Sequence, residues 1–136
     1  MGTWGTAPFD NDDAMDFFGE IEDFPPEALL SRLRATLTAT AERPGHIEVS
    51  EANVAVAAAA LVAAGRSRLA RAWEPAVDGW LTTKRPRTSA DDHALALRAL
   101  DRVAGPDSEW MELWGRTSSG QDVRDRIDDL RKILCS

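Results

Sequence analysis

The chain has 136 residues, 43% of them hydrophobic, and its 23 acidic and 16 basic side chains give a net charge of −7 at pH 7. This length suits one domain with its own core, and the charged fraction of 29% argues against collagen-like, disordered and coiled-coil classes. The lone cysteine, Cys135, excludes an intrachain disulfide framework and favours a reducing cytoplasm. The longest apolar run, residues 54–64, is shorter than the ~20 residues of a membrane-spanning helix. We expect a single cytoplasmic domain over 1–136 that does not enter a membrane.

The N-terminal part of the chain predicts an irregular segment followed by a helix. Glycine and proline residues interrupt residues 1–10, and we expect this segment to pack on the helices. Asn11 or Asp12 would cap the first helix, because a short side-chain oxygen accepts the free N–H groups of a first turn. The helix should end at residues 24–26, Phe-Pro-Pro. Its apolar face is predicted from the spacing of Ala14, Phe18 and Ile21.

The middle of the chain predicts two further helices. The second should open at Pro26 and stop near Glu42, with an inward stripe of Leu30, Leu33 and Leu37. The third should open at Ser50. Its residues 52–64 are so rich in alanine that neighbouring helices can approach closely, which predicts the central and most buried helix. Gly65 weakens this helix, and the sequence leaves open whether the chain continues as helix to Trp73 or forms a separate turn.

The C-terminal half predicts four more helical segments. Pro75 should open a helix through Leu81, and residues 84–87 should form a loop. Thr88 or Ser89 would cap the next helix, which Gly105-Pro106 ends, with an inward face of Leu97, Leu100 and Val103. Asp107 or Ser108 would cap a short helix whose residues Trp110 and Trp114 pack in the core. The clearest stripe follows, at Val123, Ile127, Leu130 and Leu134. No segment alternates as a strand does, so the sequence predicts an all-α bundle of about six or seven short helices.

The charges are distributed unevenly along the chain. Residues 1–31 contain eight acidic side chains and no basic one, whereas residues 32–136 contain 15 acidic and 16 basic side chains. We call these eight acidic residues the acidic block. One interpretation is a solvated helix face whose aromatic neighbours point into the core. A second is a face that attracts a basic partner, with the candidate residues Asp10, Asp12, Asp13, Asp16 and Glu20. A third is docking of the block on the chain's own basic stretch, residues 66–87.

Most catalytic and metal-binding patterns are incomplete. A calcium loop that starts at Asp10 would need glycine at its sixth position and glutamate at its twelfth, where the chain has Met15 and Ile21. His46-Ile47-Glu48 has the spacing of a zinc deaminase but lacks the cysteine pair that completes that site. His93 follows two aspartates, and the pattern favours a solvated first turn over a histidine–carboxylate base. The sequence therefore predicts no metal, no cofactor and no catalytic residue, and its weak basic footprint does not favour nucleic-acid binding.

One N-terminal motif is more specific than these patterns. Residues 4–17 resemble the opening of domain-of-unknown-function family 4259, a group of small bacterial proteins, with a pattern of approximately W-G-x-G-x-F-x-N-D-x-A followed by an acid and an aromatic residue. Ala7 replaces the usual second glycine. The resemblance implies a bacterial, cytoplasmic, single-domain protein, and it implies no activity and no catalytic residues. We interpret the motif as a structural clasp that holds the N-terminal segment on the bundle, formed by Trp4, Gly5, Phe9, Asn11 and Asp12.

Two hypotheses for the function follow. The leading one is a non-enzymatic interaction protein, of the immunity or antitoxin kind, that presents the acidic N-terminal face to a basic protein partner. The alternative is a small ligand- or metal-binding domain, or an enzyme, that uses the cluster of Asn11, Asp12 and Asp16.

Overall fold

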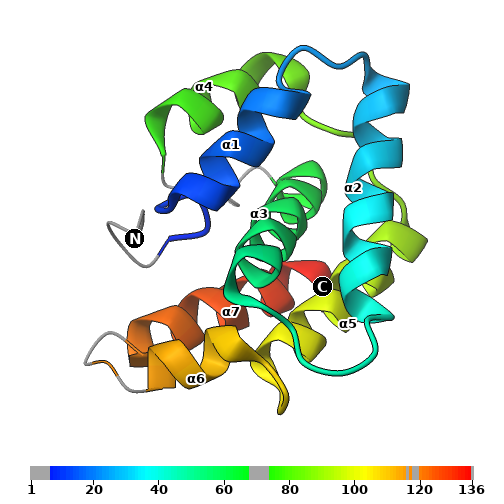
Figure 1. Ribbon diagram of the computed structural model, residues 1–136. Helices are drawn as coiled ribbons and strands as arrows, with labels where there is room; N and C mark the ends of the chain where they lie inside the picture. Colours follow the sequence, from blue (N-terminus) through cyan, green and yellow to red (C-terminus); the bar gives the residue numbers. More distant parts are fainter. Residues whose placement is uncertain (1–6, 68–73, 116, 118–119, 136) are drawn as a thin grey trace.

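The fold is all-α, as predicted. The computed structural model describes residues 7–67, 74–115, 117 and 120–135 (Figure 1). In these residues the chain forms seven helices: α1 (Asp12–Ile21), α2 (Pro26–Ala41), α3 (Val49–Arg66), α4 (Pro75–Lys84), α5 (Ala90–Ala104), α6 (Glu109–Gly115) and α7 (Gly120–Cys135). They contain no strand, and their only β pairing is a single parallel bridge between Ile47 and Ser108.

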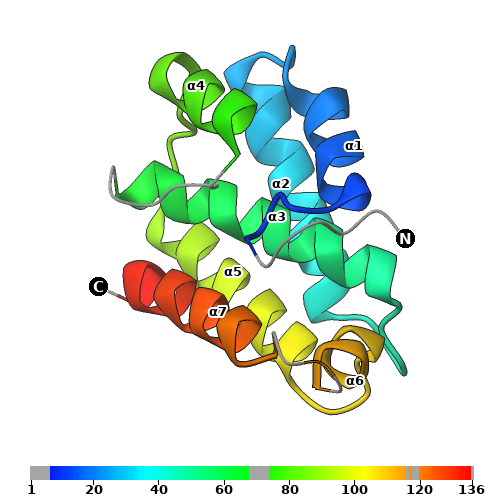
Figure 2. The ribbon, with the colours of Figure 1, turned by 90° about the vertical axis from the view of Figure 1, so that its left-hand side faces the viewer.

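Helix α3 forms the centre of the bundle, as its alanine-rich sequence predicted. It contacts α1, α2, α5, α6 and α7, and Figure 2 shows it running between α1 and α4 on one side and α5 and α7 on the other, with α2 passing behind it. Every residue from Ala55 to Ala64 is buried, because small side chains let the surrounding helices approach the α3 backbone. Helix α3 is also long and apolar enough to cross a membrane, but 67% of it is buried inside the protein, as in a core helix.

Most predicted helix boundaries agree with the structure, but α1 ends at Ile21, before the predicted stop at residues 24–26, and α4 continues to Lys84, which was predicted in a loop. Ser89 caps α5 in a capping box with Asp92, and Asn11 caps α1. Helix α3 instead begins at Val49, one residue before the predicted Ser50, and no side chain caps it from Glu48. The Val49 N–H donates to Oε1 of Glu109, 2.8 Å away. A carboxylate from the start of α6 thus replaces the local cap, which a local pattern cannot reveal.

The buried stripes agree with the structure in α7 and differ in two other helices. Val123, Ile127, Leu130 and Leu134 are all buried, as predicted. In α2 the buried stripe starts at Leu29, and Leu30 is only half-buried. In α5 Leu97 is half-buried, whereas Leu100 and Val103 are buried as predicted. Adjacent leucines lie about 100° apart on a helix, so the sequence places the apolar face only to within one residue.

Aromatic contacts join the N-terminal segment, α1 and α4. The rings of Phe9 and Phe18 meet edge to face with centroids 6.3 Å apart, and Phe18 meets Trp80 in the same way at 5.5 Å. The indole N–H of Trp80 donates to the carbonyl of Glu22 at 2.9 Å, just after the end of α1. These contacts fix α4 against α1. Residues 68–73, where a continued helix and a separate turn were both open, lie outside the described residues.

Candidate functional site

The predicted clasp is only partly within the described residues. Phe9 is fully buried, and the Asn11 side chain caps α1 by accepting from the Ala14 N–H at 2.8 Å. The loop before α1 is held by Asp10, whose carboxylate accepts from the Ala7 N–H at 3.2 Å. Asp12 lies exposed in the first turn of α1 and is not its cap. Trp4 and Gly5 lie outside the described residues, so the clasp itself stays a prediction.

The acidic block does not form one continuous face. Asp13, Asp16 and Glu20 line a groove between α1, α2 and the start of α3, because positions i, i+3 and i+7 lie on one side of a helix. Asp10 and Asp12 are not part of its lining. Of the five candidate residues of the acidic face, the fold therefore brings three together.

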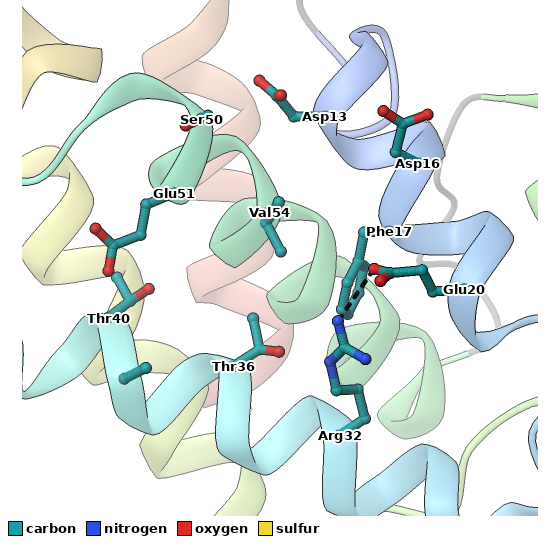
Figure 3. Close-up of a pocket in the computed structure, with 11 residues that line it drawn as sticks. Asp13, Asp16, Phe17, Glu20, Arg32, Thr36, Thr40, Ser50, Glu51 and Val54 are labelled. Atoms are coloured by element: carbon teal, nitrogen blue, oxygen red, sulfur yellow. Dashed lines mark hydrogen bonds and ion pairs between the residues drawn. The ribbon is translucent and has the colours of Figure 1, made fainter.

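The groove has a volume of about 410 Å³, and we call it the acidic groove. Figure 3 shows its carboxylates on two walls, with Asp13, Asp16 and Glu20 on α1 and Glu51 in the first turn of α3. Arg32 of α2 is the only basic residue in the lining. The sequence analysis missed Glu51 and Arg32 as site residues, because they belong to other helices and only the fold places them beside the block.

Two of the four carboxylates in the groove are already paired with arginine. Arg32 contacts Glu20 at 3.0 Å, and its guanidinium carbon lies 5.5 Å from the centroid of the Phe17 ring. Glu51 lies 3.5 Å from the guanidinium of Arg43. A guanidinium has several N–H donors and stacks on aromatic faces, and the contacts of Arg32 show that the α1 wall of the groove accepts this group. Arg43 is not part of the lining and reaches Glu51 from outside the groove.

The remaining polar groups of the groove have free acceptor capacity. Asp13 accepts one hydrogen bond, from the Asn53 side chain at 3.0 Å. Asp16 is exposed and has no partner among the described residues. Thr40 also lines the groove, but it is only 1% exposed. Figure 3 shows its oxygen on the side of the groove, but so little of Thr40 is exposed that the two carboxylates are the acceptors open to a ligand.

A buried amide connects the groove to the other end of the bundle. Asn53 of α3 is 7% exposed. Its Oδ1 accepts from the Trp110 indole N–H at 3.0 Å, while its Nδ2 donates to Asp13 as described above. Both polar atoms of the amide are therefore used, and the contacts fix which end of Asn53 faces which helix. Asn53 was not predicted as a site residue, since a single asparagine in an alanine-rich run carries no recognisable pattern.

His93 is buried, which contradicts the predicted solvated first turn. It is 7% exposed, with Nε2 2.7 Å from the Thr88 hydroxyl and Nδ1 3.2 Å from Nη1 of Arg66. Since a guanidinium can only donate, Nδ1 accepts and the imidazole is neutral, with its proton on Nε2. Burial and the charge of Arg66 lower the pKa of His93. The helix packs this side inward because Ala96, Leu100 and Val103 continue the same buried face.

The aspartate beside His93 does not form a histidine–carboxylate base with it. Asp92 is bound by Arg34, whose Nε and Nη2 lie 2.6 and 3.1 Å from the two carboxylate oxygens. It also accepts from the Ser89 N–H at 2.9 Å. The hydrogen bond from Arg34 is the main cause that lowers the pKa of Asp92. Arg34 thus links α2 to the start of α5, and these contacts give the Asp92 carboxylate a structural role.

The residues of the alternative hypothesis are not assembled as a metal site. Asn11 uses its side-chain oxygen as a helix cap, and Asp12 and Asp16 lie exposed one turn apart. The described residues contain no group of three or more histidine, cysteine or acidic side chains that could hold a metal. His46 lies exposed, with Nε2 3.7 Å from Oε2 of Glu112.

Comparison with known proteins gives one result. The model of the family described as Domain of unknown function (DUF4259) matches residues 2–126, which confirms the resemblance that the N-terminal motif indicated. No curated protein and no solved structure matches the chain.

Proposed function

The chain belongs to the DUF4259 family, and because that family has no assigned activity, we propose from the geometry that it is a non-enzymatic protein-interaction module. The acidic groove receives an arginine side chain of a basic partner protein. The observation that carries this proposal is the arrangement around Arg32, which the groove wall holds between the Glu20 carboxylate and the Phe17 ring.

The free groups of the groove suit a second guanidinium. Asp16 and the second oxygen of Asp13 supply carboxylate acceptors that no arginine among the described residues occupies. A guanidinium has five N–H donors in a planar fork, so it can use several of these acceptors at once, as a compact ammonium cannot. The volume of about 410 Å³ is sufficient for a long side chain without rearrangement of the helices.

The biological setting is part of the same proposal. An immunity- or antitoxin-like protein neutralises its partner by covering it, and an acidic groove that takes up basic side chains is suited to a partner that binds nucleic acid. We also propose a cytoplasmic location in a bacterium, which the exposed free thiol of Cys135 supports.

A capped pentapeptide with two arginines tests the proposal, with its two-citrulline counterpart as the uncharged ligand. The groove variant is Asp13→Asn with Asp16→Asn, which removes both free carboxylates and still leaves Asn53 a side-chain oxygen acceptor at position 13. The matched control, Asp12→Asn with Asp129→Asn, changes the net charge equally at exposed positions outside the groove. We expect the groove variant to bind the arginine peptide about fivefold to tenfold more weakly, the control to bind as the wild type does, and the citrulline peptide to bind to none of them. Equal weakening in both variants would show attraction by total charge and refute the groove.

The same two variants identify the natural partner. In affinity capture from the source cells, a partner of the groove is lost with the groove variant and retained with the control. The captured protein should elute at moderate salt, because charge pairs at an open surface are screened over ~10 Å at 0.1 M ionic strength.

A further inference from the structure

A second groove lies where the α1–α2 connection meets the α4–α5 connection. Both connections lie at the same end of the bundle in Figure 1, and the groove between them has a volume of about 550 Å³. It shares no residue with the acidic groove. Its volume is in the range of roughly 300–1,000 Å³ that small-molecule sites occupy.

The walls of this second groove are apolar and partly exposed. Phe24 and Leu30 are half-buried, and Pro25 and Pro26 are exposed. Leu30 is the leucine that the sequence placed in the core stripe of α2, and the structure turns it into this groove instead. Ligand sites are typically clefts lined by apolar side chains. The solvent-facing side of a helix usually carries polar residues instead.

Three basic residues, Lys84, Arg85 and Arg87, line the α4–α5 side of the groove. The Lys84 ammonium donates to the carbonyl of Glu22 at 3.2 Å, and the Arg85 guanidinium donates to the carbonyls of Ala64 and Ser67. These two cations thus bind the C-terminal ends of α1 and α3, where carbonyls lack helical partners. Arg87 is exposed and has no partner among the described residues, so it is available to an anion.

The opposite wall carries negative charge. Asp23 and Glu27 line the side formed by the α1–α2 connection and the start of α2, and neither has a partner within the described part of the chain. An anionic group is repelled from that wall and attracted to the other. The two walls therefore select a ligand that is charged at one end and fix its orientation in the groove.

We propose that this groove binds a small organic carboxylate, with its apolar body against Phe24 and Leu30 and its anionic group beside Arg87. The ligand is a free small molecule, since a groove between two loops takes up one short chain and, of the three cations in its lining, two already bind backbone carbonyls. The site is separate from the acidic groove, and its ligand has the opposite charge.

Three eight-carbon probes test this site in the full chain: octanoate, octanol and octylammonium. Binding is followed by the shifts of backbone amide NMR signals. We expect octanoate to bind about fivefold to tenfold more tightly than octanol and octylammonium to bind most weakly, with the largest shifts at residues 23–30 and 83–87. Equal affinity for octanoate and octanol, tighter binding of octylammonium, no binding of any probe, or shifts centred elsewhere would each refute the proposal.

The variants separate the charge from the apolar wall. Arg87→Gln should weaken octanoate about fivefold and leave octanol unchanged, whereas Arg98→Gln, at an exposed position of α5 outside the groove, should change neither. Leu30→Ala should weaken both probes. If Arg87→Gln and Arg98→Gln had the same effect on octanoate, or if anionic phospholipid vesicles bound the chain and octanoate did not, the assignment would be wrong.

Discussion

The buried amide of Asn53 gives the sharpest test of the structure. Asn53→Ala leaves the indole N–H of Trp110 without an acceptor, and Trp110 is only 4% exposed. A buried donor that loses its partner costs about 1–3 kcal/mol. Asp13 is half-buried, so water can replace its lost hydrogen bond, and that part adds about 0.5–1 kcal/mol. The free energy of unfolding should therefore fall by about 1.5–4 kcal/mol.

This loss is large enough for a thermal melt. A chain of 136 residues has an unfolding entropy of about 0.29 kcal/mol/K at ~2.1 cal/mol/K per residue, so Tm should fall by about 5–14 °C. Ser50→Ala, at an exposed position of the same helix, is the control and should change Tm little.

A double-mutant cycle isolates the hydrogen bond from the loss of packing. Trp110→Phe removes the N–H donor, so in the double variant the truncation of Asn53 no longer leaves an unsatisfied indole. We expect a coupling free energy of about 1–2 kcal/mol between the two positions by denaturant melts. An Asn53→Ala variant within ~0.5 kcal/mol of the wild type, or a cycle with no coupling, would show that the amide does not link α3 to α6.

Three further predictions concern the other end of α3 and the helices packed on it. Burial and the neighbouring guanidinium lower the pKa of His93, so protonation favours the unfolded chain. Stability should be full above the unfolded pKa of about 6.5 and fall as the pH drops through the folded pKa. Denaturant melts between pH 7.5 and 5 should show this loss in the wild type and in His46→Gln, and its absence in His93→Gln; an equal loss in all three would contradict it. Gly65→Ala should destabilise by about 1–3 kcal/mol, because a Cβ there would lie 2.5 Å from the carbonyl oxygen of Pro86; a Tm at or above that of the wild type would refute this close approach. Arg34→Met should cost about 1–2 kcal/mol, because the carboxylate that it binds is 6% exposed, and an unchanged melt would show that the pair contributes nothing.

Local patterns predicted the helices because each signal acts within one turn. Asn11 and Ser89 are caps whose oxygens bind N–H groups of their own helices, and the α7 stripe repeats every three or four residues along one element. Such features need no knowledge of the fold. The alanine-rich run of α3 was equally informative, since only a central helix has use for so many small side chains.

The sites depend on contacts between elements, and these were missed. Glu51 and Asp16 are 35 positions apart in the chain yet line one groove. His93 was expected to be exposed to solvent, because two aspartates precede it. In the structure Arg34 of α2 pairs with one of these aspartates, Asp92, and Arg66 of α3 contacts the imidazole of His93. A single sequence contains no signal for such pairings, because the partner residues are ordinary arginines at unremarkable positions.

The fold divides the acidic block between two grooves, and this division can be tested. Helix α1 ends at Ile21, so Asp13, Asp16 and Glu20 lie on the acidic groove while Asp23 and Glu27 line the second groove. Neutralising Asp23 and Glu27 as Asn and Gln removes repulsion from an anion, and octanoate should then bind about twofold to fivefold more tightly. The arginine peptide should bind as it does to the wild type, because its groove is unaltered. If the same two changes weakened the arginine peptide instead, the acidic block would act as one undivided surface, and the division into two grooves would be wrong.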